Sequence, residues 1–287
     1  MNGKHFKSIV SISAILAVVA VALFPVVSHS DVLAWEKGSL LLEIPAENTV
    51  FIIGEELIYN VSYSIFDLGE VKLQITDTTT KMGKKIFIAK AFIDSYSGIP
   101  FVNLHQVFYS EMTTVPYSMY FTVHNTADPK AIQYLTYEFQ YTKNKAVYEM
   151  GVRQKQSSDR KGSEFVTTFQ QDGLSLFYFA RTHFRNKQKV QAPIFINEKS
   201  AMTEFNFMGK IGSQEIDAVT YPIETVEFDG NANFIGIFGL TGYFQGFFSN
   251  DAAAIPVVAK MKVLVGSIHI ELTKWSRPGW IPPRANG

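Results

Sequence analysis

The chain has 287 residues, carries 26 basic and 26 acidic side chains, and contains no cysteine. This charge balance provides no strong positive field, so we expect no nucleic-acid partner. The missing cysteine excludes disulfides, thiolate metal sites and a cysteine nucleophile.

The first 30 residues are typical of a secretory signal. Two lysines precede an apolar run at 9–27, and Ser28 and Ser30 supply the small residues of a cleavage site before Asp31. Because the run approaches the length of a membrane-spanning helix, an uncleaved anchor is the alternative. We expect an exported protein, periplasmic or associated with the outer membrane, with no transmembrane helix after the signal.

Alternation of apolar and polar residues predicts strands through most of the mature chain. EELIYNVSYSIF and VKLQIT flank the turn DLGE and predict a β-hairpin over residues 55–76. A second strong hairpin is predicted from IPVVAKMKV and SIHIELTKW, over residues 255–275. Further strands are predicted at 86–93, 116–124, 133–142, 145–153, 193–198, 202–209, 214–221 and 223–229.

The segment QKQSSDRKGS at 154–163 is polar and has no apolar period. It predicts a solvated loop and a candidate hinge between two halves, 50–153 and 164–275. An N-terminal segment at 31–49 precedes the domain at 50–275, and the proline-rich tail at 276–287 is predicted to be irregular.

One helix is predicted near 172–184, in QDGLSLFYFARTHF. Asp172 is a suitable N-cap, and Arg181 near the C-terminal end complements the helix dipole. Leu174, Phe177 and Tyr178 share one face with Arg181 at helical spacing. This face is predicted to pack against the sheet.

The stretch GIFGLTGYFQGFFSND at 236–251 combines four glycines with five aromatic residues. It lacks both the GK[ST] of a Walker loop and the spacing of a dinucleotide-binding loop. We predict a strand bent by its glycines, in which aromatic rings fill the space that the glycines leave. The candidate walls of a ligand cavity are therefore Tyr243, Phe244, Phe247 and Phe248, together with Phe177 and Tyr178 of the helix.

Catalytic motifs receive little support. His105, His124, His183 and His269 are too far apart in the sequence for a zinc motif, and no GxSxG is present. Ser158 and Lys161 match S-x-x-K only within the polar loop. Glu55 and Glu56 are adjacent in a strand, so they point to opposite faces. We predict no catalytic residue, no metal and no cofactor.

Three segments resemble a known family. GEELIYNVSYSIFDLGEVKLQI, DGLSLFYFAR and FFSNDAAAIPVVAKMKVLVGSIHIEL are similar to the bacterial exported family called domain of unknown function 3108. In that family the last turn usually carries charged residues, where this chain has Ala252, Ala253 and Ala254. The resemblance implies an envelope protein without assigned chemistry. A looser fold analogy is to the LolA and LolB lipoprotein carriers.

Together these features predict a mainly β protein with a large curved antiparallel sheet, open or half-barrel, packed on one helix. The first hypothesis is a non-catalytic envelope protein that binds a lipid, another apolar ligand or an envelope partner. The alternatives are a hydrolase with a dispersed site, such as His105 or His183 with a carboxylate, and a structural protein associated with the outer membrane.

Overall fold

The computed structural model describes residues 49–99, 103–155, 157–185, 187–234, 242–262 and 267–286. The predicted signal and all but the last residue of the segment at 31–49 lie outside these ranges. Fourteen strands among the described residues form one antiparallel sheet. They are β1 (Glu56–Tyr63), β2 (Phe66–Lys81), β3 (Lys84–Ser95), β4 (His105–Thr113), β5 (Ser118–Asn125), β6 (Gln133–Gln140), β7 (Lys145–Val152), β8 (Arg160–Phe165), β9 (Gln188–Ile196), β10 (Lys199–Gln214), β11 (Ile223–Ala232), β12 (Gly242–Ser249), β13 (Pro256–Lys262) and β14 (Ser267–Ser276).

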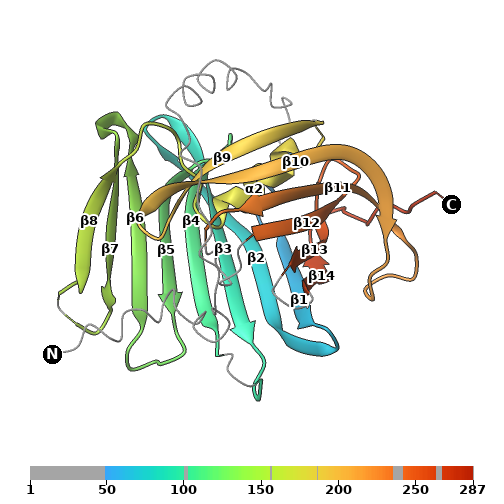
Figure 1. Cartoon of the computed structure of the whole chain (residues 1–287), viewed down its shortest axis with the longest axis horizontal. Coiled ribbons are helices and arrows are strands. Elements are labelled where there is room, and N and C mark those ends of the chain that lie inside the picture. The colour runs from blue at the N-terminus through green and yellow to red at the C-terminus, as the bar shows by residue number, and fades with distance from the viewer. Residues whose placement is uncertain are drawn as a thin grey trace, which may run out of the picture.

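The sheet is open, with β8 at one edge and β9 at the other. Its order is β8-β7-β6-β5-β4-β3-β2-β1-β14-β13-β12-β11-β10-β9, so the first and last strands of the chain pair at its centre. Figure 1 shows β9 and β10 crossing in front of the N-terminal strands. Phe195 of β9 meets Tyr137 of β6 edge-to-face at 4.9 Å, so the N-terminal wing (β1 to β8) and the C-terminal wing (β9 to β14) enclose a shared core.

The helix α2 (Ser175–His183) lies between the wings, as Figure 1 shows. Asp172 lies three residues before the first residue of α2: its Oδ1 accepts hydrogen bonds from the N–H groups of Leu174 (2.7 Å) and Ser175 (2.8 Å), and the Ser175 hydroxyl accepts one from the Asp172 N–H (2.8 Å). This reciprocal cap satisfies donors that a helix start leaves free. The predicted mainly β fold with one packed helix is confirmed.

The structure corrects three expectations for local structure. The predicted loop at 154–163 contains the start of β8, an edge strand whose side chains are nearly all exposed and therefore show no apolar alternation. The predicted strands at 202–209 and 214–221 are replaced by the long strand β10, because Gly209 (φ 61°) forms a bulge instead of ending the strand. Residues 215–222 form no strand, and β4 is an additional strand.

The C-terminal tail is largely irregular, as predicted, but it is held in place. Arg284 forms a single antiparallel bridge with Ile223. The Trp280 ring packs edge-on against Trp275 at 5.3 Å, and its indole N–H donates to Asp251 (2.7 Å). The division of the domain into two halves stays a prediction.

Candidate functional site

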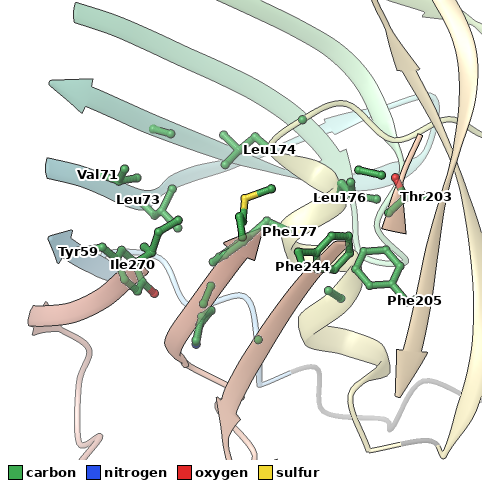
Figure 2. Close-up of a pocket in the computed structure, with 18 of the residues that line it drawn as sticks. Tyr59, Val71, Leu73, Leu174, Leu176, Phe177, Thr203, Phe205, Phe244 and Ile270 are labelled. Carbon is green, nitrogen blue, oxygen red and sulfur yellow. The ribbon is translucent and has the colours of Figure 1, made fainter. Parts of the chain in front are cut away.

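An apolar cavity of about 270 Å³ lies between α2 and the inner face of the sheet. Both wings and the helix contribute to its lining, as Figure 2 shows for ten labelled residues. Of the described residues that line it, none is a histidine and none carries a charged side chain. The lining includes Tyr59, Val71, Leu73, Ala91, Ile93, Phe108, Leu174, Leu176, Phe177, Ala180, Thr203, Phe205, Phe228, Phe244, Phe247, Phe248, Met261 and Ile270.

The C-terminal wall of the cavity is built from paired phenylalanines and glycines on β11 and β12. Phe228 lies opposite Gly246, and Phe244 lies opposite Gly230. In each pair a Cβ atom on the glycine would lie 2.3 Å from a carbon of the partner ring. The rings can therefore lie flat across the neighbouring strand only because the glycines have no side chain. Phe205 on β10 extends this wall, with its ring 5.5 Å from that of Phe244.

Four of the six predicted cavity residues lie on the cavity: Phe177, Phe244, Phe247 and Phe248. The structure places the other two elsewhere. The Tyr243 side chain is 46% exposed, and its hydroxyl donates to Asp229 at 3.3 Å. The Tyr178 ring is fully buried and stacks on Phe51 at 5.4 Å, behind the helix face that borders the cavity. Alternation separates Tyr243 from Phe244, and helical geometry separates Tyr178 from Phe177.

Two buried hydroxyls add polarity to the cavity wall. The side chains of Tyr59 and Thr203 line the cavity, and neither hydroxyl has a hydrogen-bond partner among the described residues. Burial raises the pKa of Tyr59 well above its ordinary value, although the charge of Arg181 opposes this shift. The Tyr59 phenol is therefore neutral at physiological pH.

A buried ionic cluster lies beside the cavity. Arg181 of α2 is fully buried and forms a bidentate pair with Glu55, with Nη1–Oε1 and Nη2–Oε2 distances of 2.6 and 3.1 Å. It also donates to the carbonyl oxygens of Ala254 (3.1 Å) and Ala253 (3.0 Å). Arg277 binds the same Glu55 carboxylate and the carbonyl of Thr49. Burial disfavours the Arg181 charge, but the Glu55 carboxylate outweighs this and raises the pKa of Arg181.

This cluster gives Arg181 a role that sequence reasoning missed. The side chain lies in the last turn of α2, as predicted, but its contacts join the helix to the residue just before β1 and to the alanine turn after β12. Asp251 shapes that turn, because its Oδ1 accepts hydrogen bonds from the N–H groups of Ala253 (2.9 Å) and Ala254 (3.2 Å). Ala253 and Ala254 therefore contribute backbone oxygens to Arg181 at this turn.

The histidines considered for a hydrolase lie apart from the cavity. His105 Nδ1 contacts Asp94 at 2.8 Å on an exposed part of β3 and β4. His183 is buried, stacks on Phe179 at 4.0 Å and forms a hydrogen bond through Nδ1 with the Phe179 carbonyl (2.7 Å). In the described ranges no three metal-ligating side chains group together. Likewise, no described helix is long and apolar enough to cross a membrane.

No protein-family model and no curated protein matches the chain. Among solved structures, it is similar to a β-barrel-like protein of domain of unknown function 1849 from Brucella abortus, with 11% identity, a TM-score of 0.46, and coverage of 79% of this chain and 98% of that one. A protein from Bacteroides fragilis, described as exported with a YmcC-like fold, gives 8% identity, a TM-score of 0.33 and coverage of 79% and 97%. A protein from Parabacteroides distasonis, described as a lipoprotein, gives 8% identity, a TM-score of 0.32, and coverage of 79% of this chain and 96% of that one.

The resemblance to the domain of unknown function 3108 and the analogy to the lipoprotein carriers stay predictions.

Proposed function

We propose that the protein is an exported, non-catalytic envelope protein that holds a lipid chain or another apolar ligand in the cavity between α2 and the sheet. The observation that carries this proposal is the lining, in which most side chains are aliphatic or aromatic, Thr203 and Gln245 are polar, and no described lining residue is charged. Transfer of apolar surface from water into such a site is favourable, by about 0.8 kcal/mol for each buried methylene.

The size of the cavity narrows the class of ligand. Small-molecule sites typically enclose about 300–1,000 Å³, and this cavity, at about 270 Å³, lies just below that range. A single acyl chain or a compact apolar molecule fits this volume better than a lipid with several chains. Export and a place in the envelope rest on the signal-like first 30 residues.

The test is native mass spectrometry and lipid extraction of the protein purified from its own host. We expect a co-purifying apolar molecule near one per chain in the wild type. Ala180→Phe, on α2, and Ala91→Leu, on β3, add side-chain volume to the cavity from opposite sides, so both should lower its occupancy. Ser163→Phe, on the exposed strand β8, is the control and should retain the ligand. A wild-type protein that carries no apolar molecule would contradict the proposal.

A further inference from the structure

One end of the N-terminal wing carries a distinct surface. The β2–β3, β4–β5 and β6–β7 turns lie together there, because neighbouring strands are antiparallel; they are at the upper left of Figure 1. The chain after β8 joins them, since the Val166 N–H donates to the Asn144 carbonyl at 3.0 Å. We call this surface the turn face, and it comprises Lys81, Met82, Lys84, Lys85, Val115, Lys143, Lys145, Phe165 and Phe169.

Large apolar side chains project from the turn face into solvent. Met82 is 73% exposed, Val115 55%, Phe165 71% and Phe169 51%. Single exposed apolar residues are ordinary, but these four come from neighbouring turns and from the segment that packs against them. Such a concentration indicates a surface that meets a partner.

Lysines surround these apolar side chains. Lys81, Lys84, Lys85, Lys143 and Lys145 are all exposed. Four acidic residues lie near the same end: Asp77, Glu111, Glu138 and Glu164. Glu111 is buried and accepts hydrogen bonds from Lys81 and Tyr109, so its carboxylate neutralises the charge of Lys81. Among the described residues, the other four lysines have no ion pair, and the turn face carries a net positive charge.

The aromatic part of the turn face is rigidly held. The Phe169 ring stacks on Tyr117 at 4.0 Å and meets Tyr141 edge-on at 4.9 Å. Lys84 Nζ lies 5.6 Å from the centre of the Phe169 ring and donates a hydrogen bond to the Tyr117 hydroxyl at 2.8 Å. A half-exposed phenylalanine is thereby fixed beside a cation and does not fold back into the core.

We propose that the turn face binds the surface of an anionic lipid membrane. Lysines interleaved with exposed apolar side chains are the combination that interfacial binding uses: the cations approach the headgroups while the apolar side chains enter the boundary with the acyl chains. The observation that selects a lipid surface is this charge complementarity, with four lysines that form no ion pair with a described carboxylate. The proposal holds whether or not the cavity carries a ligand.

The experiment is co-sedimentation of the protein without its signal with vesicles of phosphatidylcholine alone and of phosphatidylcholine mixed with phosphatidylglycerol. We expect binding to the mixed vesicles only, weakening as salt is added. The triple variant Lys85→Gln, Lys143→Gln and Lys145→Gln should lower the partition constant by roughly fivefold for each lysine removed. Met82→Ser with Val115→Ser should also weaken binding while leaving the charge unchanged.

The matched control replaces three exposed lysines away from the turn face by glutamine: Lys130, Lys189 and Lys262. This control has the same net charge as the lysine variant and should bind like the wild type. Equal losses in the two triple variants would mean that net charge alone drives binding, and would overturn the proposal. A wild type that binds neither vesicle, or both equally, would overturn it as well. Circular dichroism melting checks that each variant is folded.

Discussion

Gly246 of β12 lies directly opposite Phe228 of β11, and a Cβ atom on Gly246 would lie 2.3 Å from a ring carbon of Phe228. The Phe228 ring in turn stacks on Phe248 at 4.5 Å. The glycine therefore sets the position of two aromatic side chains that line the cavity. Glycines on β11 and β12 therefore shape the wall of the cavity.

Gly246→Val should destabilise the fold, because the valine side chain would displace the Phe228 ring. Overpacking of this kind costs about 1–3 kcal/mol. Urea denaturation measures the change in the free energy of unfolding. Gly212→Ala is the control, because a Cβ atom at Gly212 on β10 would meet nothing within 4 Å. The double variant Gly246→Val with Phe228→Ala should lose less stability than the sum of the losses in the two single variants, because the small alanine side chain at position 228 leaves room for the valine. If the two losses simply add, the proposed contact is contradicted.

Gly242 has a different role, so its substitution should act through the backbone. Its φ is +87°, and a Cβ atom there would meet nothing within 4 Å. Gly242→Val should cost about 1–2 kcal/mol from the left-handed conformation alone, measured by the same denaturation. If Gly242→Val and Gly246→Val both leave stability unchanged, a strand bent and shaped by glycines is the wrong description.

Arg181→Met should be among the most damaging single substitutions in the chain. It removes the bidentate partner of Glu55 and leaves the Ala253 and Ala254 carbonyls without their donor. Breaking a buried ion pair by removing one partner costs about 3–5 kcal/mol. Arg160→Met is the control: its pair with Glu198 lies at the surface, where such pairs contribute about 0–1 kcal/mol. If the two variants lose similar amounts of unfolding free energy, the buried Arg181–Glu55 pair is no more important to stability than a surface pair.

His183 should make stability depend on pH. Burial lowers the pKa of His183 below its ordinary 6.5, although its hydrogen bond to Phe179 opposes the shift. Below about pH 6.5 His183 therefore binds a proton in the unfolded chain, whereas in the folded chain it does so only at lower pH. The stability associated with neutral His183 is complete above pH 6.5 and is lost as the pH falls. Urea denaturation across this window should show a flatter pH dependence for His183→Gln than for the wild type. An unchanged slope would mean that His183 does not titrate differently on folding.

The apolar pattern of the sequence predicted which face of most strands and of the helix is buried, but it did not predict contacts between distant segments. Alternation placed Tyr59, Val71 and Leu73 on an inward face, and helical spacing placed Leu174 and Arg181 on a buried one. The pair of Glu55 with Arg181 spans 126 residues. From the sequence, Glu55 was only one of two adjacent carboxylates at a strand start. Its partner depends on which strands meet at the centre of the sheet, and period-two alternation contains no such information.

The cavity was predicted only in part for a related reason. Phe177, Phe244, Phe247 and Phe248 line it, whereas Val71, Ile93 and Phe108 on the N-terminal strands were not among the candidates. These residues resemble any other inward-facing apolar residue in a strand. A space between them and α2 arises from how the two wings curve, and composition does not determine that curvature. The sequence did not predict the edge strand β8, because nearly all of its side chains are exposed and apolar and polar residues therefore do not alternate along it.

The most direct test of the central claim is a fluorescence titration with cis-parinaric acid, a fluorescent fatty acid, after the purified protein has been stripped of lipid. We predict saturable binding near one molecule per chain in the wild type, and binding weakened by at least an order of magnitude in Ala180→Phe. Ser163→Phe should bind like the wild type. If Ala180→Phe remains folded and binds the probe as tightly as the wild type, the cavity between α2 and the sheet is not the binding site.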